Sequence, residues 1–185
     1  MPIYLVPEHD TPLSQGDIFK DVPYWRPHRK SKTDAWPNPT QRGNLVLDLQ
    51  ISAYAVLATH SCDVSKATEF LFVSAMPAEA VARALAGGEA QMSDQEFRNW
   101  IVKNLHPRYH FFERFVAGTE PEIEIIPELV VNFRNPFTLR AEYVKEKLMP
   151  DHRVLCLQEI YGAEFGNRFG QFYSRVATDR NMESI

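Results

Sequence analysis

The chain has few cysteines and no long apolar run, and each shortage excludes a class of protein. Cys62 and Cys156 are the only two cysteines in 185 residues, too few for a disulfide framework or a four-ligand zinc motif. No apolar run approaches the roughly 18 residues of a membrane span, and no basic region followed by an apolar one opens the sequence. We therefore expect a cytoplasmic protein with two free thiols and no membrane segment.

A second shortage is that of net positive charge. The 20 lysines and arginines are outnumbered by 24 acidic residues, which gives a formal net charge of −4 and excludes coating of nucleic acid through the overall field of the protein. Apolar material is abundant, since 44% of the residues are hydrophobic and 12% are aromatic. Because the chain also shows no repeat and no linker, we expect residues 1–185 to form a single domain around one core.

Short apolar runs separated by proline, glycine and asparagine predict strands, most of them in the first half of the chain. The predicted strands cover residues 3–6, 17–19, 45–49, 52–58 and 70–74, with further short or edge strands within 108–117, 122–133 and 153–157. Residues 23–44 contain four prolines and little periodicity, so we expect a long surface loop there. Long loops inside compact domains often carry function.

The pattern becomes helical in two places. A helical insertion is expected at about 78–105, where Ser93 and Glu96 form a capping-box signature. A C-terminal helix is expected at about 158–176, because apolar residues recur there every three or four positions. This stripe contains Tyr161, Phe165, Phe169, Phe172 and Val176. Together, strands and helices predict a mainly β protein with helices, an α+β fold.

Five consecutive residues hold more potentially reactive side chains than any other segment of this length in the sequence. They are Thr59, His60, Ser61, Cys62 and Asp63. If the preceding strand continues through them, His60 and Cys62 share one face as a thiolate–imidazole pair or as two metal ligands. Their parallel direction would suit a shared metal better than a direct hydrogen bond. The structural alternative is that Ser61 and Asp63 make turn hydrogen bonds and that Cys62 is a small buried hydrophobe.

The segment from 106 to 110 supplies two further kinds of candidate. His106 and His110 have side chains that bind metals, but Pro107 between them argues against a shared helical face. We therefore predict no metal centre and no cofactor. Arg108 and His110 could instead provide charge stabilisation and general acid–base catalysis in phosphodiester cleavage. The alternative is an edge strand whose polar side chains face water.

The predicted loop at 23–44 is the other candidate site. It holds five potential cations and two tryptophans, namely Trp25, Arg26, His28, Arg29, Lys30, Lys32 and Trp36. Cations beside aromatic rings suit either an RNA backbone with a base to stack on or an acidic protein partner. The structural alternative is a solvated loop whose tryptophans fold back on the core.

Several short motifs, taken in order, resemble a group of uncharacterised bacterial proteins. In this chain they read LSQGDIF, VLATHSCDVSK, FLFVSAMP, HPRYHFF, VVNFRNPF and FGNRFGQFYSRVA. The pattern of that group is Gly-Asp-Ile, Thr-Gln-Ser-Cys-Asp, Arg-Tyr-His-Phe, Val-Asp-Phe and a terminal helix ending in Arg-Val-Gly-Leu-Pro. This chain differs at His60, where the group has Gln, at Asn132, where it has Asp, and in its terminal RVATD.

The first half also resembles the MazF and PemK toxins, which implies a small, strongly bent β-barrel (SH3-like) with helices packed on it. The matching segments are Gly16-Asp17-Ile18, the loop from 25 to 43, and the strands at 55–61 and 70–76. Such toxins cut RNA with the arginine of an Arg-Pro pair, and this chain has Ala53 and Tyr54 there. Thr59 or Ser61 matches the toxin hydroxyl. Without the arginine, RNA cleavage loses a large electrostatic contribution.

These observations predict a non-catalytic binding or regulatory module that holds a protein partner in a bacterial defence, toxin–antitoxin or stress-signalling system. RNA is a possible further ligand, and the resemblance to the toxins implies a possible homodimer. One alternative is a metal-independent endoribonuclease of the MazF/PemK type, with the 59–63 cluster, Arg108 and His110 in its site. The other is an enzyme or redox sensor that depends on Cys62, which requires a lowered thiol pKa.

Overall fold

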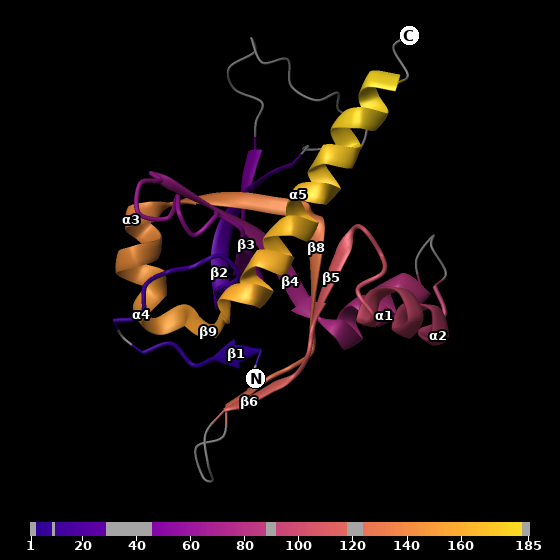
Figure 1. Ribbon diagram of the computed structural model, residues 1–185, viewed down its shortest axis with the longest axis horizontal. Helices are drawn as coiled ribbons and strands as arrows, with labels where there is room; N and C mark the ends of the chain where they lie inside the picture. Colours follow the sequence, from indigo (N-terminus) through magenta and orange to yellow (C-terminus); the bar gives the residue numbers. More distant parts are fainter. Residues whose placement is uncertain (1–2, 9, 29–45, 88–91, 118–123, 183–185) are drawn as a thin grey trace.

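The structure is organised around one large antiparallel sheet (Figure 1). This computed structural model describes residues 3–8, 10–28, 46–87, 92–117 and 124–182. In chain order the strands of the sheet are β1 (Tyr4–Leu5), β2 (Ile18–His28), β3 (Val46–Leu57), β4 (Glu69–Pro77), β5 (Tyr109–Phe112), β8 (Leu129–Arg140) and β9 (Arg153–Leu157). They lie side by side in the order β1-β9-β2-β3-β4-β8-β5. Two short strands, β6 (Phe115–Ala117) and β7 (Glu124–Ile126), form a separate antiparallel pair.

The sheet is open at both ends. Its edge strands are β1 and β5, and within the described residues no pairing joins them. A barrel requires its first and last strands to pair, so the closed barrel implied by the toxin resemblance is not confirmed. The coarser prediction, an α+β fold, is confirmed, and the structure shows that its large sheet is antiparallel.

Helical segments lie between β4 and β5, between β8 and β9, and after β9. The first group is α1 (Ala78–Ala86), α2 (Asp94–Phe97) and the π-helical η1 (Arg98–Val102), all within the predicted helical insertion. The second group is α3 (Ala141–Tyr143), the π-helical η2 (Val144–Leu148) and α4 (Met149–His152), outside the predicted helices. The predicted capping box is confirmed, because Ser93 and Glu96 each accept the backbone N–H of the other. None of the helices in the described part of the chain combines the length and apolar character needed to cross a membrane.

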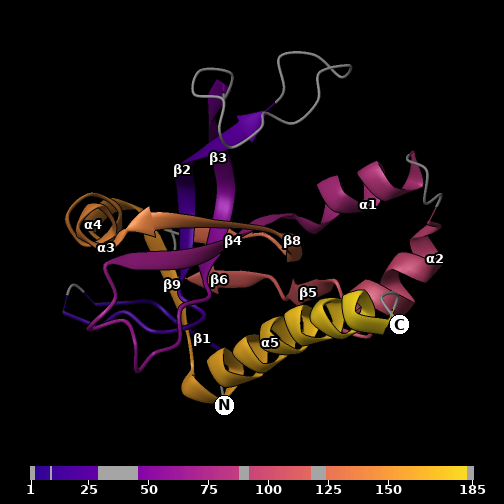
Figure 2. The ribbon, with the colours of Figure 1, turned by 90° about the horizontal axis from the view of Figure 1, so that it is seen from above.

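Helix α5 (Glu159–Met182) lies along one face of the sheet (Figure 2). Its predicted apolar stripe packs against the core, with Phe165 fully buried and the other described members of the stripe against the same cluster. Phe133 on β8 makes ring contacts with three of these side chains. The side chain of Val176 lies outside the described part of the structure. Because burial of one phenylalanine side chain contributes about 1.5–3 kcal/mol, the stripe fixes α5 to the sheet.

The opposite face of the sheet carries a second apolar cluster. Neighbouring side chains on a strand point to opposite faces, so Val56 belongs to the α5 cluster whereas Ala55 and Leu57 belong to the second. Val144 and Leu148 of η2 complete that second cluster. The centre of the sheet is therefore buried on both faces.

Strand β2 is much longer than predicted. The expected strand at 17–19 with a loop from residue 23 is wrong, because β2 continues to residue 28 and pairs with β3 as far as its end, for example Trp25 with Leu49. The two prolines of β2 are tolerated because β9 pairs only with the first two residues of β2, which leaves the rest as an edge. Trp25, Arg26 and His28 are thus strand residues. Four other predicted loop residues, Arg29, Lys30, Lys32 and Trp36, lie outside the described residues.

Candidate functional site

The 59–63 cluster lies in a turn rather than on a strand. Strand β3 ends at Leu57, and the N–H of Asp63 donates to the carbonyl of His60 at 2.9 Å. Thr59 explains why the strand stops, because its hydroxyl accepts the N–H of Leu71 at 2.7 Å and so replaces a carbonyl of the strand ladder. The alternation of faces expected for a continuing strand is therefore wrong.

The turn brings an imidazole, a thiol and a carboxylate together. His60 Nδ1 and Cys62 Sγ are 3.1 Å apart, and Cys62 Sγ donates to Asp63 Oδ1 at 3.6 Å. The direct contact forms because the turn folds the two side chains toward each other, whereas an extended strand would hold them parallel. All three side chains are exposed. The interpretation of Cys62 as a buried hydrophobe is wrong, and Cys156 is the buried cysteine.

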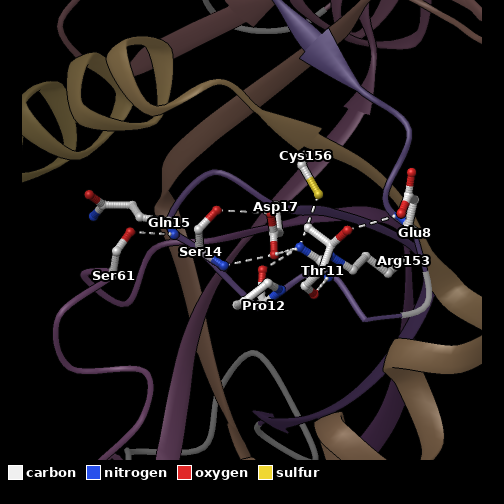
Figure 3. A network of polar contacts seen from close by, with 9 residues as sticks. All are labelled: Glu8, Thr11, Pro12, Ser14, Gln15, Asp17, Ser61, Arg153 and Cys156. Atoms are coloured by element: carbon white, nitrogen blue, oxygen red, sulfur yellow. Dashed lines mark hydrogen bonds and ion pairs between the residues drawn. The ribbon is translucent and has the colours of Figure 1, made fainter.

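Ser61 and Gln15 connect this turn to the segment before β2 (Figure 3). The Gln15 N–H donates to Ser61 Oγ at 3.0 Å, and Gln15 Nε2 donates to the Ala58 carbonyl at 2.8 Å. Helix α5 passes so close that a Cβ on Gly162 would lie 2.5 Å from the Gln15 carbonyl oxygen. The backbone of the turn is therefore fixed from two sides, while its imidazole and thiol remain exposed.

A buried ion pair supports the same segment (Figure 3). Asp17 Oδ2 and Arg153 Nη2 are 2.7 Å apart, and both side chains are almost fully buried. Burial raises the pKa of Asp17, while the positive charge of Arg153 opposes that shift. Arg153 also donates to the carbonyls of Thr11 and Pro12 and to Cys156 Sγ. Because these partners occupy the guanidinium within the fold, the pair has a structural role. The Gly-Asp-Ile motif indicated Asp17, but nothing local indicated its partner.

Arg108 and His110 lie apart from the turn. Arg108 Nε donates to Asn132 Oδ1 at 2.9 Å, and its guanidinium lies over the ring of Tyr109. His110 is only 5% exposed, so the expectation that it faces water from an edge strand is wrong. Burial lowers the pKa of His110 to about 3, which leaves its imidazole neutral near pH 7. Within the described residues, no hydrogen bond or ring contact links either side chain to the 59–63 turn.

The outer part of the β2–β3 ribbon exposes an apolar face. Trp25 pairs with Leu49 across the two strands, and Pro23 pairs with Ile51, so these side chains share one face. Trp25 is 61% exposed, Leu49 57% and Ile51 68%, which places more than half of each residue's surface in water. Leu47, also exposed, continues the row on β3. We call Trp25, Leu47, Leu49 and Ile51 the ribbon face.

A groove with two cations lies on the other face of the same ribbon, because Tyr24 and Arg26 alternate with Trp25 along β2. Its volume is about 290 Å³, and it is lined by Tyr24, Trp25, Arg26, Arg134, Asn135, Pro136 and Phe137. Tyr24 stacks on Phe137 of β8 with ring centroids 4.3 Å apart, which makes one wall aromatic. Neither Arg26 nor Arg134 forms an ion pair with any described residue. The structure thus brings Trp25 and Arg26 together with Arg134, for which the sequence carried no signal.

No protein-family model, curated protein or solved structure matches this chain. Its function is therefore inferred from the geometry and chemistry of the described residues. Among the described residues, the ribbon face with its groove and the 59–63 turn each combine exposed side chains with a hydrogen-bonded backbone, and we take them as the candidate sites.

Proposed function

We propose that the protein is a binding module that holds a protein partner on its ribbon face, within a bacterial defence, toxin–antitoxin or stress-signalling system. The observation that carries this proposal is the exposure of Trp25, Leu49 and Ile51 side by side on two paired strands. Apolar surface in water is unfavourable by about 25 cal/mol per Å². Soluble proteins expose contiguous apolar side chains mainly where another molecule binds.

The surroundings of the ribbon face define the chemistry of the partner. Its aliphatic side chains offer no hydrogen-bond donor to a phosphate, so they favour a protein over RNA. Trp25 and Arg26 are of the residue types that dominate the binding energy of protein interfaces. The guanidinium groups of Arg26, which lies opposite Asp48 on β3, and of Arg134 form no ion pair with another described residue and are suited to carboxylates. We therefore expect the partner to present an apolar segment flanked by Asp or Glu.

A distant relationship to the MazF and PemK toxins is part of the same proposal. Its support is the sequence resemblance together with the antiparallel neighbours β2, β3 and β4, which follow Gly16-Asp17 in the implied order. Ala53 and Tyr54, in place of the toxin Arg-Pro pair, favour a role without RNA cleavage.

The endoribonuclease alternative has less support from the geometry. Its candidate residues lie in two places that no described contact joins, the 59–63 turn and the start of β5. The Arg108 side chain is engaged by Asn132, and the buried, neutral His110 is badly placed to exchange a proton with a substrate.

The Cys62-dependent alternative is favoured by one observation, the 3.1 Å contact between His60 Nδ1 and Cys62 Sγ. If His60 activates the thiol, iodoacetamide should alkylate Cys62 at least tenfold more slowly in the His60→Ala variant than in the native protein. Mass spectrometry of the Cys62 peptide over time measures both rates. Equal rates would show that Cys62 is an ordinary exposed thiol that His60 does not activate.

A photo-reactive amino acid in place of Ile51 tests the main proposal in bacteria that produce the full chain. This position is 68% exposed, so the replacement disturbs little packing. Position 160 on α5 is the matched control, because Ile160 is 70% exposed and lies outside the ribbon face. We expect irradiation to link position 51 to one protein other than a second copy, and to link position 160 to none.

Four outcomes would contradict the proposal. Adducts with RNA alone would favour a nucleic-acid ligand, and adducts with a second copy alone would make the ribbon face a homodimer interface. Equal products from positions 51 and 160 would show unspecific contact. The absence of any adduct at position 51 would show that the face has no partner in the cell.

A further inference from the structure

We propose that the 59–63 turn binds one zinc ion through His60 Nδ1, Cys62 Sγ and the carboxylate of Asp63, and that a water molecule completes the coordination. This site is independent of the ribbon face and of the partner-binding function. The prediction of no metal centre was made for want of ligands beyond the first two, and the turn supplies the third. Under the expected strand geometry Asp63 would have pointed to the opposite face.

The distances from Cys62 Sγ to the other two ligand atoms are close to those around a small cation. All three lie within 4.8 Å of one another, with 3.1 Å between His60 Nδ1 and Cys62 Sγ and 3.6 Å between Cys62 Sγ and Asp63 Oδ1. In a tetrahedral zinc site, Zn–N distances near 2.0 Å and Zn–S distances near 2.3 Å place neighbouring ligand atoms roughly 3.4–3.6 Å apart. The pair at 3.1 Å needs to open by roughly half an ångström to meet that geometry, which a side-chain rotation in an exposed turn permits.

The backbone of the turn is fixed in a way that directs the ligands outward. The Thr59 hydroxyl accepts a hydrogen bond from the N–H of Leu71, and the Ser61 hydroxyl accepts one from the N–H of Gln15. Val64 is buried in the second core cluster. Thr59 and Val64 are thus partly or fully buried, whereas Ser61 and the three ligands at 60, 62 and 63 are exposed. An ion is therefore held by a backbone that is already ordered, so binding costs little conformational entropy.

The ligand types select the metal. A thiolate and an imidazole are soft or borderline ligands that favour zinc, whereas magnesium and calcium require oxygen ligands throughout. Three protein ligands with a fourth open position are the arrangement of zinc sites that accept an exchangeable water molecule. On binding, the Cys62 thiol proton is released to solvent and the Zn–S bond forms in its place, without any oxidation or reduction.

Titration of the reduced full-length protein with Co²⁺, followed by competition with Zn²⁺, tests the site. Cobalt reports thiolate ligation through a sulfur-to-metal charge-transfer band. The native protein should bind one Co²⁺ per chain with this band, and Zn²⁺ should displace it. The Cys62→Ser variant should lose the band, and His60→Ala and Asp63→Asn should each weaken binding at least tenfold. Ser65→Ala is the control, since Ser65 is exposed in the same turn and is no ligand.

Several results would overturn the site. These are the absence of the band in the native protein, its persistence in Cys62→Ser, or equal weakening by Ser65→Ala. A stoichiometry of one metal per two chains would also overturn it, since the ion would then bridge copies. Circular dichroism of each variant establishes that the fold is intact, and Asp63→Asn keeps the test valid where another variant fails to fold.

Discussion

Water is almost entirely excluded from the ion pair between Asp17 and Arg153, whose side chains are 0% and 2% exposed. Removing two charges from water is costly, and only their mutual attraction and further hydrogen bonds offset that cost. Arg153 obtains those bonds from two backbone carbonyls and from Cys156 Sγ. Burial raises the pKa of the Cys156 thiol to about 12, so this cysteine is an inert thiol. The two cysteines therefore differ in their surroundings: Cys156 is buried beside the ion pair, whereas Cys62 is exposed.

Removing one charge of the pair should be strongly destabilising. Arg153→Met should lower the free energy of unfolding by about 3–5 kcal/mol, because Asp17 is left buried without its counter-charge. Arg83→Met removes only an exposed ion pair with Glu79 and should cost less than about 0.5 kcal/mol. Urea unfolding at pH 7 measures both. A loss below about 1 kcal/mol for Arg153→Met would show that the pair contributes no more than a surface pair.

His110 should make stability depend on pH in one direction. Burial lowers its pKa in the folded protein from 6.5 to about 3, whereas the unfolded chain keeps the ordinary value. As the pH falls below about 6.5, the unfolded chain takes up a proton that the folded protein does not. This contribution is complete above that pH and is lost progressively below it, by about 2 kcal/mol at pH 5.

Thermal unfolding of His110→Leu tests this pH dependence. The variant lacks the titrating group, so its melting temperature should fall less between pH 7 and pH 5 than that of the native protein. The comparison cancels the other groups that titrate over the same range. An equal fall in both proteins would show that His110 titrates normally in the folded state.

At the scale of elements, helix α5 approaches the segment before β2 through its glycines. A Cβ on Gly162 would lie 2.5 Å from the Gln15 carbonyl oxygen, whereas a Cβ on Gly170 would meet nothing within 4 Å. The two positions are therefore a matched pair on one helix. They differ in the presence of a neighbour, since Gly162 is buried near the start of the helix and Gly170 is exposed in its middle.

Alanine should have opposite effects at these two glycines. Gly170→Ala should stabilise the protein by about 0.5–1 kcal/mol, because glycine is a poor helix former. Gly162→Ala should destabilise it by about 1–3 kcal/mol, since backbone must move to admit the methyl group. Thermal unfolding of both variants measures the difference. Stabilisation by Gly162→Ala would mean that α5 does not pack on Gln15 as described.

The same elements show how far the sequence could predict the fold. The stripe of α5 was predictable because its periodicity is local. The length of β2 was not, because its prolines locally favour a loop while pairing with β3, a distant segment, decides the outcome. The 59–63 turn was predictable only in part. Its reactive residues can be read from the sequence, but its shape depends on the hydrogen bond between Thr59 and Leu71, twelve positions away. The strand predicted at 45–49 contains Leu47 and Leu49, but their exposure was not predictable, because it depends on what the whole fold packs against them.

At the scale of the molecule, the outer part of the β2–β3 ribbon projects from the rest of the sheet (Figures 1 and 2). A partner can therefore reach the ribbon face without displacing a described helix. The groove on the other face of the ribbon adds Arg26 and Arg134 to an otherwise acidic chain with a net charge of −4. If the proposed partner is acidic, we expect this local positive charge to favour its binding here.

The most direct test of partner binding is the affinity of the crosslinked partner for three forms of the protein, measured by calorimetry with the purified components. These are the native chain, Leu49→Glu on the ribbon face and Ile160→Glu on α5, both at exposed apolar positions. We expect Leu49→Glu to raise the Kd at least tenfold, about 1.4 kcal/mol, and Ile160→Glu to leave it within about twofold. Native affinity in a folded Leu49→Glu variant would contradict the proposal that the ribbon face holds the partner.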